Sequence, residues 1–124
     1  MIRKKYCVDG AWLESKTEKW IPVTDSSTGA VIAEVPSCTQ NEVLAAIDAA
    51  DRAFPAWSQM SLSKRTQLLF HWRNVLMEHL EELTLLCARE LGKTLNEARG
   101  DVLKAIEPTE LACATPYLTQ GAAS

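Results

Sequence analysis

Hydrophobic and polar residues follow two different periods along this chain, and the change falls near residue 39. Before that point, short apolar runs are separated by glycine, proline and polar turn residues. Tyr6–Val8 and Ala11–Leu13 flank the pair Asp9 and Gly10, which suits a type I′ turn because that turn requires positive φ at both central positions. The pattern therefore predicts a β-hairpin at the start of the chain.

A second turn follows the apolar residues 20–23. Residues 24–29 are polar and end in a glycine, which is typical of a turn, and Ala30–Val35 then has the composition of a short strand. We expect Pro36 to end this strand, because proline cannot donate a backbone hydrogen bond. Residues 1–38 are thus predicted to form a region of strand and hairpin.

From residue 39 onward the apolar period lengthens to about 3.6 residues, which predicts helices. Thr39 and Glu42 have the spacing of a capping box, in which the hydroxyl of the first accepts from the amide of the second and the carboxylate bonds back. We expect Pro55 to end or kink this first helix early. Its apolar side consists of Val43, Ile47, Ala50, Phe54 and Trp57.

A second helix is predicted to begin after Ser61, a good N-cap residue, and to end at Gly92, which favours the left-handed conformation of a helix stop. Its leucines recur every seven residues, with two aromatic rings and a further leucine beside them. His79 on this stripe is expected to be a core histidine satisfied by one hydrogen bond. The stripe comprises Leu62, Leu69, Leu76 and Leu83, with Trp72, His79 and Leu86 beside it.

The second helix is wide in its apolar coverage, because Leu68, Val75 and Leu80 extend the stripe beyond the seven-residue seam. Such a helix needs neighbours on two sides. Each large apolar side chain left in water forfeits about 1.5–3 kcal/mol of burial free energy. We therefore expect this helix to be covered by further polypeptide, either more of the same protein or another subunit.

Thr94 and Glu97 have the spacing of another capping box and open a third helix, in which Pro108 is expected to produce a kink. Residues 39–124 are thus predicted to be a three-helix region. Together with residues 1–38 they predict a mainly helical α+β fold, in which both regions belong to one incomplete domain. The apolar side of the third helix consists of Leu95, Ala98, Val102, Ile106 and Thr109.

At 124 residues the chain has the size of a single domain. Its net charge is -3 and no segment concentrates Lys and Arg, so we expect no nucleic-acid partner. The densest apolar run, residues 83–88, is far shorter than the roughly 20 residues of a membrane span, and no export signal follows the basic residues 3–5. These features predict a cytoplasmic protein with no membrane partner, whose four cysteines are free thiols.

Few side chains have the spacing that catalysis or metal binding requires. The nearest two glycines are eight residues apart, so neither a G-x-G-x-x-G turn nor a Walker A loop is present. His71 and His79 lack the i, i+4 spacing of a helical zinc pair, and Cys87 and Cys113 lie among apolar residues that do not activate a thiol. The residue pattern therefore predicts no catalytic residue, no cofactor-binding residue and no metal ligand.

The densest polar cluster lies on the third helix and includes Lys93, Arg99 and Lys104. A cation projecting from this helix can bind a substrate carboxylate. Several members of the cluster, such as Glu97 and Asp101, are also spaced as ordinary neighbours on a helix surface. On residue chemistry alone, a solvated face is the favoured interpretation.

Four stretches stand in an order and spacing that chance rarely produces: Tyr6–Trp12, Ser27–Pro36, Ala50–Trp57 with Arg65, and Gly92–Leu95. Together they resemble the amino-terminal part of the aldehyde dehydrogenase superfamily, and the resemblance covers nearly the whole chain. Within that superfamily Glu97–Val102, followed by Glu110–Cys113 and Pro116, is most similar to the methylmalonate-semialdehyde dehydrogenases. The resemblance implies an incomplete part of an aldehyde dehydrogenase-like α/β fold.

The family resemblance implies NAD-dependent oxidation of a short acyl semialdehyde to an acyl-coenzyme A, with NAD and coenzyme A as cofactors of the full-length enzyme. It also implies a homo-oligomer, usually a tetramer. The family's catalytic cysteine, general-base glutamate, oxyanion-stabilising asparagine and NAD-binding glycines belong to segments beyond residue 124. The resemblance therefore implies that this chain alone is inactive and binds neither cofactor.

One substrate-binding residue is implied within the chain. In that family an arginine on the helix after the Gly-Lys-Thr segment holds the substrate carboxylate, and Lys104 occupies what looks like the same place. A lysine keeps the charge but loses the planar two-pronged geometry that suits a carboxylate. Lys104 is therefore the candidate substrate-binding residue.

Two hypotheses from different classes remain open at this point. In the first, the chain is the opening segment of a dehydrogenase and contributes scaffold, a surface for the remainder of the enzyme and one substrate-orienting cation. In the second, it is a free-standing helical module without catalysis that self-associates through the wide apolar face of its second helix.

Overall fold

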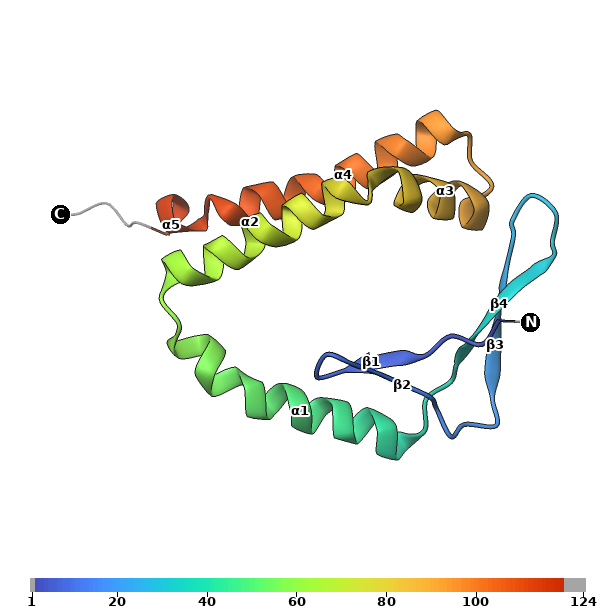
Figure 1. The fold of residues 1–124 in the computed structure, drawn as a ribbon, viewed down its shortest axis with the longest axis horizontal. Coiled ribbons are helices and arrows are strands. Elements are labelled where there is room, and N and C mark those ends of the chain that lie inside the picture. Colours follow the sequence, from blue (N-terminus) through green and yellow to red (C-terminus); the bar gives the residue numbers. More distant parts are fainter. Residues whose placement is uncertain (1, 120–124) are drawn as a thin grey trace. The chain divides into compact units, whose positions relative to one another are not determined.

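The computed structural model describes residues 2–119, and contacts within the chain divide it into two compact units, Met1–Ser58 and Gln59–Ser124. The first unit contains the strands and one helix, and the elements of the second are all helices (Figure 1). The predicted fold class, mainly helical α+β, is confirmed. This division groups the first helix with the strands, whereas the predicted regions separate strands from helices. That both regions belong to one incomplete domain stays a prediction.

The predicted hairpin consists of β1 (Tyr6–Val8) and β2 (Ala11–Leu13), which pair antiparallel. Asp9 and Gly10 join the two strands with φ angles of 51° and 73°. These are the positive values that a type I′ turn requires at its two central positions. The hairpin prediction is therefore confirmed.

A second antiparallel pair is formed by β3 (Trp20–Thr24) and β4 (Val31–Pro36). The Asp25 carboxylate holds the turn between them by accepting hydrogen bonds from backbone amides two and three residues later, at 2.9 and 3.1 Å. The predicted strand is β4, which ends at its proline. The additional strand is β3, whose interior Pro22 lacks an amide proton and obscures the strand pattern.

The first helix, α1 (Gln40–Gln59), begins with the predicted capping box. The Thr39 amide donates to the Glu42 carboxylate at 2.7 Å, and the Glu42 amide donates to the Thr39 hydroxyl at 3.4 Å. Of the two expected effects of Pro55, an early end of the helix is wrong, since the helix runs one turn beyond it, and a kink there stays a prediction. A proline removes only one backbone hydrogen bond, so the residues after it can still complete a turn.

The single second helix expected between Ser61 and Gly92 is wrong, because the structure divides it into α2 (Leu62–Glu78) and α3 (Leu80–Leu91). His79 lies between them with φ −97° and ψ 12°, as the N-cap residue of α3. Its Nδ1 is 2.9 Å from a carboxylate oxygen of Glu82, which stands at the position of the acidic partner in a capping box. The apolar stripe therefore extends over two helices. 

Helix α4 (Leu95–Cys113) begins with the predicted capping box between Thr94 and Glu97, and it continues past Pro108. A kink at that proline stays a prediction. A short helix, α5 (Thr115–Leu118), follows, so the described residues contain five helices rather than the predicted three. It begins with a proline in its first turn, where the missing amide proton has no helical partner to lose.

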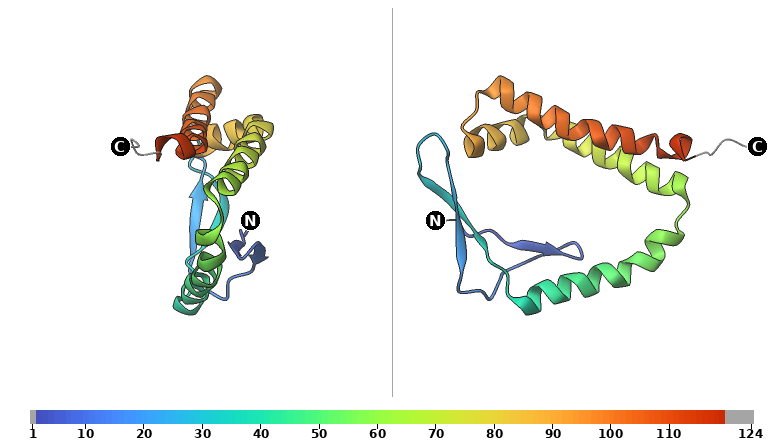
Figure 2. Two further views of the ribbon diagram at one scale, coloured as in Figure 1. Left: turned by 90° about the vertical axis from the view of Figure 1, so that its left-hand side faces the viewer. Right: turned by 180° about the vertical axis from the view of Figure 1, so that it is seen from behind.

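The core of the second unit lies where α4 packs alongside α2 and α3 (Figure 2). Leu80, Ala98, Ile106 and Cys113 are buried, and Ala98 is 0% exposed. Among the described residues of the first unit, Ala33 on β4 is the one buried apolar side chain. No large side chain in the described part of the chain is completely buried. The apolar core of each unit is therefore small.

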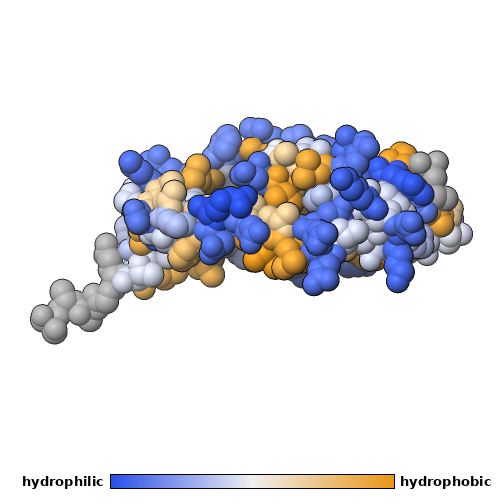
Figure 3. Space-filling view, turned by 90° about the horizontal axis from the view of Figure 1, so that it is seen from below, coloured by the Kyte–Doolittle hydropathy of each residue, from blue (hydrophilic) through white to orange (hydrophobic). Residues whose placement is uncertain are grey.

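Large apolar side chains remain exposed in both units. On α1, Ile47 is 57%, Phe54 63% and Trp57 42% exposed. Figure 3, which looks from the side on which Figure 1 draws α1, shows apolar surface between polar patches. Leu68 on α2 and Leu86 on α3 are each 50% exposed, in agreement with the expected excess of apolar surface. None of the described helices is both long enough and apolar enough to cross a membrane.

Candidate functional site

Lys104, the predicted substrate-binding residue, lies on the solvent side of α4. Ala98 and Ile106 are buried against the neighbouring helices, and a helix with about 3.6 residues per turn places Lys104 on the opposite side from them. Within the described part of the chain, Lys104 takes part in no hydrogen bond or ion pair. Its ammonium group is therefore directed away from the core and open to an anion.

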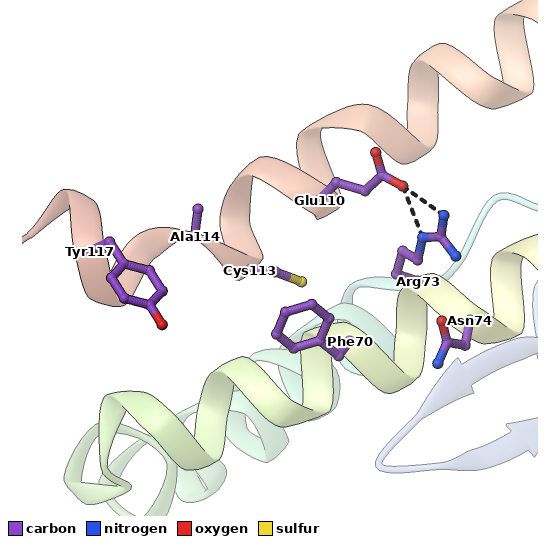
Figure 4. Close-up of a pocket in the computed structure, with 7 residues that line it drawn as sticks. All are labelled: Phe70, Arg73, Asn74, Glu110, Cys113, Ala114 and Tyr117. Atoms are coloured by element: carbon purple, nitrogen blue, oxygen red, sulfur yellow. Dashed lines mark hydrogen bonds and ion pairs between the residues drawn. The ribbon is translucent and has the colours of Figure 1, made fainter.

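A pocket of about 470 Å³ lies between α2, α4 and α5, within the second unit (Figure 4). On one side of it, Nε and Nη2 of Arg73 approach the same Glu110 carboxylate oxygen, at 2.9 and 2.8 Å. The two charges neutralise each other, and Lys104 does not line the pocket. The lining residues are Phe70, Arg73, Asn74, Glu110, Cys113, Ala114 and Tyr117.

The chemistry of this pocket is apolar rather than catalytic. Cys113 is buried, and Figure 4 shows its side chain between α4 and the ring of Phe70. No histidine is among the seven lining residues, so no imidazole base stands beside the thiol to ionise it. The pocket offers a recess for apolar groups, with one neutralised ion pair on its side.

Sequence reasoning missed this pocket, although a signal for it exists. Glu110, Cys113, Ala114 and Tyr117 follow one another at helical spacing, as do the three lining residues of α2. Each set marks one side of a helix. That the two sides face each other depends on packing between residues about 40 positions apart, which one sequence does not reveal.

His79 does not occupy the core position that the leucine stripe predicted. Its side chain is 57% exposed and pairs with Glu82 at the junction of α2 and α3. The prediction of a core histidine is therefore wrong. The break in the helix turns this residue out of the stripe, because it caps α3 instead of continuing the turn before it.

The amino-terminal ends of α1 and α4 are two places where unpaired amides and the helix dipole favour an anion. Glu42 occupies the first, and hydrogen bonds from the Lys16 and Thr39 amides lower its pKa to about 2. Glu97 occupies the second, where hydrogen bonds from the hydroxyl and amide of Thr94 lower its pKa. Two ionised carboxylates hold these positions, so neither end fits the phosphates of NAD or coenzyme A.

Metal ligands do not gather in the described residues, where no three His, Cys, Asp or Glu side chains lie together. The four cysteines are free thiols: Cys7 is exposed, Cys38 and Cys87 are half-buried, and Cys113 is buried. The described residues thus present Lys104 as an exposed cation without an ion pair, an apolar pocket between α2, α4 and α5, and broad uncovered apolar faces.

Residues 12–123 of this chain match the aldehyde dehydrogenase family. The chain belongs to that family. Over 121 residues this aldehyde dehydrogenase chain is 42% identical to the malonate-semialdehyde dehydrogenase of Listeria monocytogenes serotype 4a (strain HCC23), a match that covers 97% of the chain and 25% of the relative. Over 117 residues it is 39% identical to the mitochondrial acylating methylmalonate-semialdehyde/malonate-semialdehyde dehydrogenase of Rattus norvegicus. That match covers 94% of this chain and 22% of the relative.

Solved structures of aldehyde dehydrogenases contain the same fold. The methylmalonate-semialdehyde dehydrogenase from Oceanimonas doudoroffii matches with a TM-score of 0.91 and 28% identity, over 98% of this chain and 25% of that one. The NAD-dependent benzaldehyde dehydrogenase from Corynebacterium glutamicum matches with a TM-score of 0.85 and 25% identity, over 91% of this chain and 25% of that one. The predicted partial aldehyde dehydrogenase fold is confirmed, and the chain spans about a quarter of the length of these relatives.

Proposed function

We propose that this chain supplies scaffold to an NAD-dependent, coenzyme A-acylating dehydrogenase of malonate or methylmalonate semialdehyde, and that it is inactive alone. The observation that carries the proposal is the 42% identity to a malonate-semialdehyde dehydrogenase over 97% of the chain. In the pocket of the second unit no base stands beside Cys113, and Glu42 and Glu97 occupy the amino-terminal ends of α1 and α4. We therefore assign the catalytic and cofactor-binding residues to the remaining segments of the enzyme.

Uncovered apolar surface supports the scaffold role. The apolar sides of α1, α2 and α3 expose large side chains that each lose burial free energy in water. A dehydrogenase four times the length of the matched segment has enough polypeptide to cover them. We assign the assembled enzyme to the cytoplasm because its cysteines are free thiols, as in a reducing compartment, and on the family resemblance we propose that it is a homo-oligomer.

Within this role, Lys104 orients the substrate. A malonate or methylmalonate semialdehyde carries a carboxylate, and Lys104 presents an exposed ammonium that has no ion pair within the described residues. A lysine attracts a carboxylate as a point charge, with less directional hydrogen bonding than a guanidinium group provides.

Two proteins test the scaffold proposal. The first is the free chain, which should form no NADH when it is mixed with NAD, coenzyme A and malonate semialdehyde. The second is a chimera in which this chain replaces the 121 aligned residues of the Listeria dehydrogenase, and which should form NADH. Turnover by the free chain would contradict the inactivity, and a folded but inactive chimera would contradict the scaffold role.

The same chimera tests Lys104. Replacing Lys104 with methionine removes the charge at similar length and should raise KM for the semialdehyde about tenfold, with a smaller effect on kcat, because it removes an ionic contact that the bound substrate already makes. Lys104→Arg should restore or improve the wild-type KM. Unchanged KM in Lys104→Met would remove Lys104 from the substrate site.

A second candidate function is a module that self-associates through the apolar face of the predicted second helix, on which Leu68 of α2 and Leu86 of α3 are each 50% exposed; the exposed stripe of α1 adds a further surface. Val43, Ile47 and Phe54 on that stripe are 47%, 57% and 63% exposed, and their spacing suits packing against another helix. Light scattering separates the two candidates. A discrete oligomer with cooperative melting supports the module, whereas polydisperse association supports a segment that lacks its partner polypeptide.

A further inference from the structure

Gly100 is the one described glycine that neither the backbone nor the packing of this chain explains. Gly10, Gly29 and Gly92 have φ angles of 73°, 72° and 67°, which side-chain-bearing residues rarely adopt. Gly100 instead lies inside α4 without a positive φ, and a Cβ placed on it would meet no atom within 4 Å. Glycine inside a helix is less favourable than alanine, because it loses more backbone freedom on folding. Alanine would fit this position and suit the helix better.

The surroundings of Gly100 form one exposed side of α4. Residues three, four, seven and eleven positions after a residue share its side of a helix. At these positions Leu103 is 37% and Leu111 63% exposed, and Lys104 and Glu107 are exposed. We call this side the Gly100 face; it consists of Gly100, Leu103, Lys104, Glu107 and Leu111.

The core of the second unit does not use the Gly100 face. Ala98 and Ile106, which are buried against the other helices, lie on the opposite side of α4. The face combines exposed leucines with a position where no Cβ holds a neighbour away. That combination suits a polypeptide segment that packs closely on the helix, because its backbone can approach the glycine while its apolar side chains cover the leucines.

We propose that a polypeptide segment from the part of the dehydrogenase that this chain does not span packs over the Gly100 face, with its backbone against Gly100. The occupant is argued from length, since the chain spans 25% of the Listeria relative and the rest of such an enzyme is available to make the contact. The inference rests on the proposed function and deepens it. Because Lys104 lies on the same face, the packed segment forms the wall of the substrate site beside that cation.

Gly100→Ala tests the proposal through opposite effects in two proteins. In the free chain it should raise the midpoint of the heat-induced loss of helical circular dichroism by about 2–5 °C, because alanine favours the helix and meets no neighbour. In the chimera with the Listeria dehydrogenase it should lower the melting midpoint and reduce kcat/KM about tenfold or more, because the new methyl group collides with the packed segment.

Ala105→Gly is the matched control. Ala105 is exposed on α4 but lies off the Gly100 face, so this change alters only helix propensity and should lower the midpoint in both proteins. In the free chain, Gly100→Ala should thus raise the melting midpoint and Ala105→Gly should lower it. In the chimera, both substitutions should lower the midpoint.

Several results would overturn the inference. If Gly100→Ala raises both midpoints and leaves kcat/KM unchanged, nothing packs on Gly100. If it raises KM for the semialdehyde while the chimera melts higher, the substrate and not a polypeptide occupies the face. A lower midpoint in the free chain would show that alanine does not fit. A wild-type chimera without turnover counts against the proposed function. The shifts in melting midpoint that Gly100→Ala causes in the free chain and in the chimera would still show whether a segment packs on Gly100.

Discussion

Glu42 joins two parts of the first unit that are distant in sequence. Its carboxylate accepts hydrogen bonds from the Lys16 amide and the Ser15 hydroxyl, each at 2.8 Å, in the segment after β2. It also accepts from the Thr39 amide at the start of α1. These bonds, led by the one from Lys16, favour the ionised form and lower the pKa of Glu42 from 4.5 to about 2. One side chain thus fixes a loop to a helix end.

Glu42→Gln should remove a pH-dependent part of the stability of the first unit. Because the pKa is lower in the folded state, the stabilisation is complete above the unfolded value of 4.5 and is lost as the pH falls toward about 2. The difference in melting midpoint between wild type and variant should therefore be largest at neutral pH and should vanish near pH 2. Thermal melts followed by circular dichroism over this range measure it.

The control for this experiment is Asp48→Asn, which removes an exposed carboxylate on α1. Within the described residues Asp48 takes part in no hydrogen bond or ion pair, so its removal should leave the acid dependence of the melts as it is in wild type. A wild-type acid dependence that persists in Glu42→Gln would show that another group produces it.

At the scale of single elements, α4 has two sides with different roles. One side carries Ala98, Ile106 and Cys113 into the core of the second unit. The other carries Leu111 at 63% exposure together with Lys104. The first side stabilises the unit as it stands, whereas the second is available for a partner.

Substitutions on the two sides of α4 should therefore differ in their effect on the free chain. Ile106→Ala removes a side chain that is 3% exposed and should weaken the helical circular dichroism of the free chain and shift its loss to lower urea, through lost burial and the cavity left behind. Leu111→Ala, on the same helix, should leave the signal and its urea dependence close to those of wild type. Urea titration followed by circular dichroism compares them, and equal losses would place the core elsewhere.

The ends of the elements were predictable because their signals are local. Both capping boxes form, Gly92 ends α3 in the left-handed conformation, and the Asp9–Gly10 turn has the expected dihedral angles. Each of these features depends on residues no more than a few positions apart. A single sequence contains all the information that such a feature needs.

Features that depend on distant residues were not predictable in this way. The bond between Ser15 and Glu42 spans 27 positions, and the ion pair of Arg73 with Glu110 in the pocket spans 37. The break at His79 was missed because the seven-residue repeat continues through it. Lys104 lies on the third predicted helix as expected, but no partner of its ammonium is among the described residues, so its role stays a proposal.

At the scale of the whole molecule, the apolar surface exceeds what the two small cores bury. Trp12 on β2 is 70% exposed, and Trp72 on α2 is 53% exposed. Tryptophan side chains at such exposure are common at interfaces, where their large rings are buried by a partner. The cores lack a completely buried large side chain among the described residues, so each unit alone has little to stabilise it.

We expect the free chain to show helical circular dichroism with a broad thermal transition and to bind the hydrophobic dye ANS. Exposed apolar surface binds the dye, and small cores reduce the cooperativity of unfolding. The chimera with the Listeria dehydrogenase should bind much less dye per chain and melt in a sharper transition. A free chain that melts sharply and does not bind ANS would contradict the account of uncovered apolar faces.

Local capping also bears on the order of events during biosynthesis. Because each capping box spans only four consecutive residues, α1 and α4 can begin to form on the nascent chain soon after it leaves the ribosome. Their apolar sides are then organised before any polypeptide made later can reach them. Chaperones bind such exposed apolar surfaces, so on the proposed role as the opening segment of a dehydrogenase this chain should depend on them until the covering polypeptide has been made.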